Sequence, residues 1–491
     1  MTDAKFLDGS VFRHISVMTF TASIGLMALF VVDLVDLYFL SLLGEVELAA
    51  AVGYAGSILF FTTSICIGLA IAMAALVARA VGAGETGRAK RYVVHVSLFA
   101  LAATLPLALL VWLGIENLLG LVGAEGRALE LAAVYLRIIV PSMPILALAM
   151  ASGGVLRAVG AARLAMAATL AGGLVNAVLD PILIFGLELG VAGAAWASVS
   201  ARVAVLLVGV YGVVVKTDML GRFKAELFGH DARRIAAIAG PAVLTNVATP
   251  VGNAYVTASM AAFGDDAVAG FSIIGRIIPV AFGVIFALSG AVGPVIGQNF
   301  GAGRLDRIRR ALLDALLLAG GVVLVSATLL FLLQDQIARA FGASPGAAAL
   351  LAFFASFIAV SFAFMGAQFI AHAAFNNLGR PLWSTWSNWG RATLGTIPLV
   401  WLGALWLGPE GVLLGQAAGG VIFGTGAYLT AWWLCATPER LGPSPTRTQM
   451  FRLPLSAQTV YRGWMGIFGG DRLKAGVDRP PSEQESARKG V

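Results

Sequence analysis

Charged residues are scarce in this sequence, and their scarcity argues against a soluble fold. Only 12% of the 491 residues are charged, whereas 59% are hydrophobic and the mean hydropathy is +0.88. A soluble domain of this length could not bury that much apolar side-chain surface in one core. We therefore expect the lipid bilayer to solvate most of the chain.

Cysteine and histidine are also rare, which limits the chemistry available to the chain. Cys66 and Cys435 both lie inside apolar runs, where we expect core side chains rather than a disulfide or a redox pair. His95 and His372 are remote from each other and from any cluster of cysteines or acids, so no metal site is expected. An enzyme would need a nucleophile, a metal or an acid/base cluster, and the sequence offers none.

Signals for ATP use and for secretion are missing too. The two GAG triplets, at 82–84 and 301–303, have no strand before them and no Lys-Ser/Thr after them, so they should end membrane helices rather than bind phosphate. The first fifteen residues lack the basic and apolar regions of a secretory signal peptide. No cofactor is expected beyond a coupling ion.

Long apolar runs are abundant, and they predict an all-α membrane protein. A helix needs about 20 apolar residues to cross the hydrocarbon core. Twelve runs are long enough: 16–43, 52–79, 93–120, 129–155, 164–187, 191–215, 236–263, 268–298, 312–334, 346–377, 382–407 and 411–435.

The connections between these runs predict the orientation of the chain. Alternate connections are basic, for example 79–91 and 304–310, and the intervening turns are short and acidic or neutral. By the positive-inside rule both termini should be cytoplasmic, in a bacterial inner membrane. The basic residues are thus explained by membrane orientation, and no nucleic-acid partner is expected. The polar segment 437–491 is predicted to be a mostly disordered cytoplasmic tail.

An internal repeat divides the twelve runs into two halves. At an offset near 219 residues, ALVARAVGAGETGRAKR (75–91) aligns with PVIGQNFGAGRLDRIRR (294–310), and Gly160 falls opposite Gly379. Two copies with an even number of helices enter the membrane from the same side and form parallel repeats around a central cleft. We predict one six-helix lobe over 1–220, a second over 221–436, and transport by alternating access of the two lobes.

Several motifs resemble those of the multidrug and toxic compound extrusion (MATE) transporters. They are LVDLYFLSLLGEVELAAAVG, LRAVGAARLAMAATLAGGLVNAVLDPILIFGLELGVAGAAWAS and FSIIGRIIPVAFGVIFALSGAVGPVIGQNFGAGRLDRIRRAL, within a similarity that spans about 430 residues. The resemblance implies an antiporter that expels organic cations or amphipathic drugs against an inward flow of protons or sodium ions. It also implies a working monomer in contact with membrane lipids.

Acidic residues inside the predicted helices are functional candidates, because an ionised side chain in the bilayer is costly unless it has a partner or faces a cavity. Only Asp33, Asp36 and Asp180 qualify. In the branches of the family that resemble this sequence, the cation site carries over to Asp36, Asn176, Asp180 and Ser198, with coupling in the N-terminal lobe. Asp33 is a possible accessory residue one turn from Asp36.

The chemistry of these residue types agrees with such a site. Asn176 and Asp180 are four residues apart and share a helix face. Two carboxylates brought together in a partly dry cavity do not both stay ionised easily, so one could take up and release a proton. The same oxygens could instead bind sodium, with the carbonyl of Ala177 freed by Pro181 as a further ligand. The sequence does not choose between these two ions.

The sequence departs from the family pattern at two places. Ser198 replaces the commoner threonine, and the first helix lacks the proline at which some relatives bend, with Thr21 in its place. Proton-driven bending of the first helix is therefore not expected. In the second lobe, the seventh, eighth, tenth and eleventh helices of the chain also contain no acid.

The substrate-binding surface is less well defined by the sequence. Asn246, Asn253, Gln368, Met27 and Phe282 are candidates to line the cleft, while the remaining polar residues of the second lobe should mainly link helices. The alternative function is a lipid-linked saccharide or lipid flippase of the same wider superfamily, although such a protein would be expected to line its cleft with several cationic residues.

Overall fold

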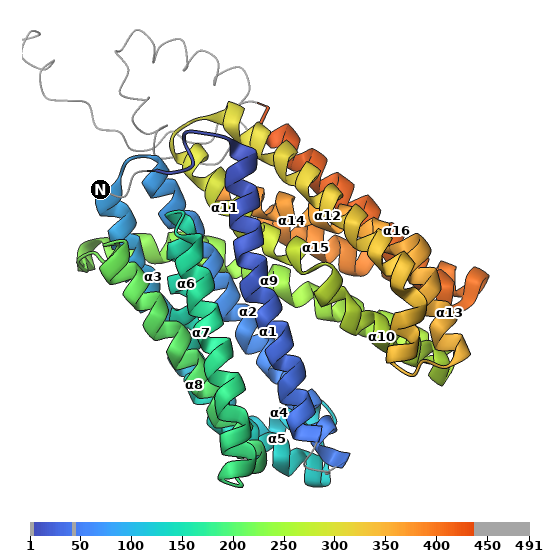
Figure 1. The fold of residues 1–491 in the computed structure, drawn as a ribbon. Helices are drawn as coiled ribbons and strands as arrows, with labels where there is room; N and C mark the ends of the chain where they lie inside the picture. The colour runs from blue at the N-terminus through green and yellow to red at the C-terminus, as the bar shows by residue number, and fades with distance from the viewer. Residues whose placement is uncertain (1–3, 42–45, 437–491) are drawn as a thin grey trace, which may run out of the picture. The chain divides into compact units, whose positions relative to one another are not determined.

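The structure is a computed structural model that describes residues 4–41 and 46–436, and this part of the chain is helical throughout (Figure 1). The predicted tail lies outside the described residues. The first half of the chain contains α1 (Val11–Ser41), α2 (Val46–Gly82), α3 (Thr86–Leu113), α4 (Ile115–Leu121), α5 (Gly126–Ile139), η1 (Val140–Ser142), α6 (Met143–Ala158), α7 (Ala162–Pro181), η2 (Ile182–Gly186), α8 (Gly190–Tyr211) and η3 (Gly212–Lys216).

The second half repeats this pattern of long helices that are interrupted by short π-helical or 3₁₀ turns. It contains α9 (Ala225–Ala261), α10 (Asp265–Ala281), α11 (Gly283–Gly301), α12 (Leu305–Ala340), α13 (Pro345–Phe353), η4 (Phe354–Ile358), η5 (Ala359–Ser361), α14 (Phe362–Asn377), α15 (Leu382–Gly390), η6 (Arg391–Gly395) and α16 (Ile397–Leu434).

Eleven stretches of the described chain are long and apolar enough to cross a membrane, and the last of them accounts for two crossings. That stretch, Leu382–Leu434, is 53 residues long and breaks at Gly408, which has a φ of 61°. A Cβ placed on Gly403 would lie 2.7 Å from the carbonyl carbon of Gly411, so the chain doubles back at this point. The all-α fold with twelve membrane helices that the sequence predicts is therefore confirmed.

Buried apolar side chains form two clusters, and each takes in part of a helix from the other half. One cluster runs mainly through α2 to α8 but includes Ile235, Ile238 and Ala239 from the start of α9. The other runs mainly through α9 to α16 but includes Ile15 and Met18 from the start of α1. The two lobe boundaries proposed from the sequence remain a prediction. The first helix of each half nevertheless anchors in the opposite core.

The ends of α2 and α11 pack directly against each other, backbone to backbone. A Cβ placed on Gly82 would overlap the carbonyl of Gln298 and lie 2.5 Å from its Cα, and a Cβ on Gly301 would overlap the carbonyl of Arg79. Only a residue without a side chain permits this approach. We call this contact the α2–α11 crossing. Both GAG triplets end their helices as predicted, with Gly84 and Gly303 each at a φ of 75°.

A short N-terminal segment, residues 4–9, lies across the same end of the molecule. The backbone N–H of Phe6 donates to Gln298 at 3.0 Å, and its carbonyl accepts from Asn299 at 3.1 Å and from Arg307 at 3.0 Å. The Phe6 side chain is buried, and a Cβ on Gly160 would lie 3.1 Å from its ring. The segment therefore contacts both halves of the chain.

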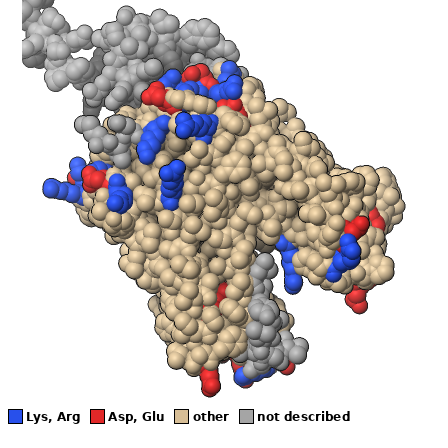
Figure 2. Space-filling model, viewed as in Figure 1, with Lys and Arg blue, Asp and Glu red and all other residues tan. Residues whose placement is uncertain are grey.

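Basic side chains gather at this end as well (Figure 2). Arg88 and Lys90 lie in the first turns of α3, and Arg304 and Arg307 lie at the start of α12, directly after the α2–α11 crossing. At the opposite end the described surface is hollowed between the two halves (Figure 2). This arrangement places the predicted cytoplasmic residues together and leaves the other end open.

Candidate functional site

Helix α7 supplies two of the predicted cation ligands from one buried face. Asn176 and Asp180 are 7% and 0% exposed, and the Asn176 amide donates to Oδ2 of Asp180 at 3.0 Å. Because Pro181 has no N–H, the carbonyl of Ala177 receives no hydrogen bond from it. The helix then widens into the π-helical turn η2, in which the N–H of Leu187 donates to the carbonyl of Ile182 at 2.9 Å.

Helix α1 brings the third ligand to the same place. It packs along α7 through small residues, since a Cβ on Gly25 would meet Thr169 at 3.3 Å and one on Gly173 would meet Val32 at 3.4 Å. The carboxyl of Asp36 interacts directly with that of Asp180. Oδ1 of Asp36 and Oδ1 of Asp180 are both buried without a hydrogen-bond partner among the described residues.

The fourth predicted ligand lies on α8 and is joined by a residue that sequence reasoning missed. Ser198 is half-buried and interacts with the hydroxyl of Tyr135, a residue of α5 that lies within electrostatic reach of both Asp36 and Asp180. A tyrosine within an apolar run is a weak signal, because the ring alone can be explained by packing. Only the fold shows that its hydroxyl belongs to this group.

One cation borders the group from the far side. Arg202, one turn after Ser198 on α8, donates to Oγ of Ser142 at 2.7 Å and to the carbonyl of Ile139 at 3.2 Å. It lies within electrostatic reach of Tyr135. No ion pair neutralises either Asp36 or Asp180 within residues 4–41 and 46–436.

The assembled donor set can hold either a proton or a small hard cation. It offers two carboxyl groups, one amide, two hydroxyls and one carbonyl that its own helix leaves unbonded. Oxygen ligands of this kind suit sodium, and a close carboxyl pair suits a shared proton. Among the described residues no group of three or more His, Cys, Asp or Glu could hold a transition metal. The side chain of Asp33 lies outside the described part of the structure.

The residues predicted to line the substrate cleft have different environments. Asn246 is half-buried and donates to the carbonyl of Ala242 at 2.8 Å, Asn253 is exposed, and Met27 packs against Gly283 of α11. Gln368 and Phe282 are buried. Gln368 donates to Oγ of Ser387 at 3.2 Å, and the Phe282 ring stacks on that of Phe362 at 4.1 Å between centroids. These two side chains lie in the protein interior and present no open surface in this structure.

His95 contacts a single acid, which sequence reasoning did not find. Its Nδ1 lies 2.8 Å from Oδ2 of Asp231, a residue 136 positions away at the start of α9, and both side chains are fully buried. The N–H of Lys224 donates to Nε2 at 3.3 Å, so Nδ1 carries the proton and donates to Asp231. Arg91 donates to the same carboxylate oxygen at 2.9 Å. This cluster fastens the chain between η3 and α9 onto α3.

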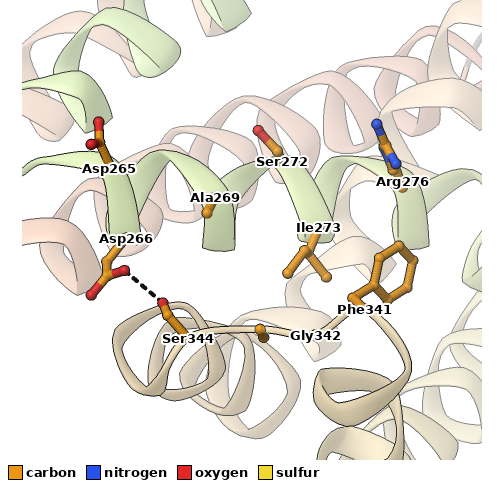
Figure 3. A pocket seen from close by; sticks show the side chains of 10 residues that line it. Asp265, Asp266, Ala269, Ser272, Ile273, Arg276, Phe341, Gly342 and Ser344 are labelled. Carbon is orange, nitrogen blue, oxygen red and sulfur yellow. Dashed lines mark hydrogen bonds between the residues drawn. The ribbon is translucent and has the colours of Figure 1, made fainter. Parts of the chain in front are cut away.

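Two cavities at the surface are separate from the predicted cation site. One, of about 420 Å³, lies between α10 and the turn before α13, where Asp266 accepts from Ser344 at 2.6 Å and Ile273 points toward the same turn (Figure 3). The other, of about 480 Å³, lies between α5 and the turn before α8 and is bordered by Glu188 and Arg127. No residue predicted from the sequence to bind ion or substrate lines either cavity.

Comparison with known proteins places this geometry in context. The MatE family model matches residues 22–182 and 241–402, two segments that begin 219 residues apart. A FAD transporter of Shewanella oneidensis is 31% identical over 440 residues, which cover 87% of this chain and 96% of that protein. The multidrug export protein MepA of Staphylococcus aureus is 26% identical over 336 residues, or 65% and 71% of the two chains. The structure of a variant of the Vibrio cholerae MATE transporter VcmN superposes with a TM-score of 0.82 at 25% identity, covering 88% and 98%.

Proposed function

Because the chain belongs to the MATE family of membrane transporters, and not to a family of enzymes, we propose that it is an antiporter that exports small organic compounds in exchange for H⁺ or Na⁺. The coupling site of this proposal comprises Asp36, Asn176, Asp180 and Ser198, with Ala177, Asp33 and Tyr135 as accessory groups. The observation that carries it is the meeting of two carboxyls from different membrane helices, each with a buried oxygen that has no hydrogen-bond partner in the described part of the chain.

A buried oxygen without a partner costs free energy in a site of low dielectric, and binding of a cation removes that cost. A proton would bridge the two carboxyls, and sodium would be held by their oxygens together with the amide and a hydroxyl. Release of the cation would restore the repulsion between the two charges. The site is therefore a two-state element that a cation gradient can drive.

Helix α1 provides the link from this site to the rest of the molecule. It contributes Asp36 to the site, packs against α7 and α11, and inserts Ile15 and Met18 into the core of the second half. A change in the position of α1 on cation binding would therefore be felt by both halves. Alternating access needs such a link, because the ion and the substrate must bias the same pair of conformations.

The substrate follows less directly from the relatives, whose names differ. The Shewanella relative is a FAD transporter and the Staphylococcus relative is a multidrug export protein. Both names agree with transport of small organic molecules, and we include the cationic and amphipathic drugs expected from the sequence. Asn246, Asn253 and Met27 are the candidates that lie on partly open surface. A lipid or lipid-linked saccharide flippase is the second candidate function.

The orientation in this proposal follows the distribution of charge. The end with the N-terminal segment and the basic turns would face the cytoplasm of a bacterial cell, with the protein in the inner membrane as a monomer. The hollow between the halves would then open to the outside. One charge that moves through 100 mV supplies about 2.3 kcal/mol, which sustains a concentration ratio of about 50.

Flux of a fluorescent dye from proteoliposomes tests the proposal. Wild-type protein should move a cationic dye when either a proton or a sodium gradient is imposed, and the effective gradient identifies the ion. Asp36→Asn and Asp180→Asn should each lose gradient-driven flux. Asp218→Asn is the matched control, because this exposed carboxyl outside the spans only pairs with Lys90. Equal flux by the two site variants and wild type would contradict the coupling site.

A further inference from the structure

Arg391 is a buried cation that has only neutral hydrogen-bond acceptors among the described residues. It lies where α15 passes into the π-helical turn η6 and is only 8% exposed. Nε and Nη2 donate to Oδ1 of Asn388, both at 3.2 Å, and Nη2 also donates to Oγ1 of Thr249 at 3.3 Å. All of these acceptors are neutral. An arginine side chain stays protonated in proteins, so a full positive charge is placed inside a membrane-spanning segment.

The lengths of these bonds show how weakly the charge is compensated. A guanidinium that meets a carboxylate does so at about 2.7–2.9 Å. Elsewhere in this chain Arg91 reaches Asp231 at 2.9 Å and Arg310 reaches Asp314 at 2.8 Å. No carboxylate forms an ion pair with Arg391 in the described part of the chain. Six acids occur between residues 240 and 436. Asp265, Asp266, Asp306, Asp314 and Asp335 lie toward the ends of their helices, and Glu410 lies beside the break of α16 at Gly408.

Three helices turn polar faces toward Arg391. We define the Arg391 cluster as Thr249 on α9, Gln368 and His372 on α14, and Ser387, Asn388 and Arg391 on α15 and η6. Gln368 donates to Ser387, and Asn388 donates to the carbonyl of Thr245 at 2.5 Å. His372 is 7% exposed and lies within the electrostatic reach of Arg391, and its Nε2 is buried without a partner among the described residues. The cluster thus holds one net positive charge and an unpaired imidazole nitrogen.

The Thr249 hydroxyl links the cluster to a more exposed stretch of α9. Helix α9 packs on α2 at one level, where a Cβ on Gly68 would lie 2.9 Å from the carbonyl of Ala239. About two to four turns further along α9, Asn246 and Thr249 are half-buried and Asn253 is exposed. Thr249 accepts from both Arg391 and Asn388 on its inner side. A ligand that replaced its hydroxyl would reach the guanidinium directly.

We propose that the Arg391 cluster binds an anionic group, a phosphate or a carboxylate, on the compound that the protein transports. This inference rests on the proposed transport function and narrows its substrate class. A guanidinium presents two parallel N–H groups that match such a group in a bidentate arrangement. Asn388 and Thr249 hold it now with neutral oxygens, which a charged ligand oxygen would replace. The two halves then bind ligands of opposite charge: the carboxyl pair of the first half binds the coupling cation, and Arg391 of the second half binds the anionic group of the substrate.

A matched pair of probes tests this assignment. Flavin mononucleotide and riboflavin share one ring system and differ by a phosphate. Their binding to the purified full-length protein in nanodiscs of neutral lipid can be measured from flavin fluorescence. We expect flavin mononucleotide to bind wild type at least tenfold more tightly than riboflavin. Arg391→Gln should abolish this preference, Arg391→Lys should keep part of it, and Arg339→Gln, which removes an exposed charge from the same half, should leave it unchanged.

Other outcomes are decisive in the opposite direction. If Arg391→Gln retains the wild-type preference, or if wild type does not distinguish the two flavins, the anion site is refuted. If the preference falls in nanodiscs of anionic lipid as steeply as in Arg391→Gln, the cluster holds a lipid headgroup and the proposal is wrong about its source. A variant that retains Arg391 but lacks dye flux under every gradient would count against the proposed antiport and not against this site. Arg391→Lys also separates loss of the site from loss of folding.

Discussion

The α2–α11 crossing can be opened by a single methyl group. A Cβ on Gly82 would lie 2.5 Å from the carbonyl carbon and from Cα of Gln298, whereas ordinary contacts of a Cβ begin at 3.4 Å. The neighbouring atoms are backbone, so no side chain can turn away. Gly82→Ala should therefore force the two helix ends apart by about 1 Å or more, at a cost of about 1–3 kcal/mol typical of overpacked interiors.

A cost of this size changes the balance between conformations. If the crossing is closed in one transport state and open in the other, a penalty of about 1–3 kcal/mol lowers the closed fraction by about 5–150-fold relative to the open one. Gly301→Ala should have the same effect, because its Cβ would overlap the carbonyl of Arg79 in the same manner. Gly320→Ala is the control, since it adds the same methyl to α12 and nothing lies within 4 Å of it.

Distances between spin labels would measure the shift. Gly87 and Asp306 are exposed, follow the ends of α2 and α11, and can each be replaced by a labelled cysteine. The native Cys66 and Cys435 are buried and should label poorly. We expect Gly82→Ala and Gly301→Ala to move the distance distribution to longer values, with Gly320→Ala unchanged. A folded Gly82→Ala protein with the wild-type distribution would refute the reasoning.

Three further predictions concern other parts of the molecule. Asp231→Ala should lower the melting temperature by an amount equivalent to about 3–5 kcal/mol, because it leaves the fully buried His95 and the half-buried guanidinium of Arg91 without their shared partner; an unchanged melting curve would contradict this. Arg307→Ala removes donors to the backbone of residues 6–9 and should make this segment exchange its amide hydrogens faster, with α12 unaffected in the same experiment. Tyr135→Phe removes the hydroxyl beside Ser198 and should weaken cation dependence of flux several-fold without loss of folded protein, whereas equal dependence would remove Tyr135 from the site.

Much of the fold could be predicted because the features that identify membrane helices lie within short stretches of sequence. Runs of apolar residues, basic turns and the two GAG triplets each depend on neighbours in the chain, and all correspond to features of the structure. The pairing of Asn176 with Asp180 is equally local, since four residues make one helical turn. The α1 helix begins at Val11, a little before the predicted run, because Val11 and Ile15 pack into the apolar cluster of the second half.

The features that could not be predicted depend on contacts between residues far apart in the sequence. His95 and Asp231 are 136 residues apart, and their connection follows from the route of the chain between η3 and α9. Tyr135 joins the candidate site only because α5 lies against α8. Phe282 is hidden because α10 ends there and its ring turns into the core to stack on Phe362. Composition and periodicity contain no information on such encounters.

The reciprocity of the α2–α11 crossing bears on the history of this chain. Gly82 meets Gln298 and Gly301 meets Arg79, and both members of each equivalent pair are separated by 219 residues. Residue i of one copy touches residue j of the other, and j touches i, which is the rule for the interface of a two-fold symmetric homodimer. In such a dimer a single mutation to glycine would have allowed both close backbone contacts at once, because each subunit carries the same residue. The crossing is what would remain of that interface after two genes became one, and it accounts for the persistence of glycine at the same place in both copies.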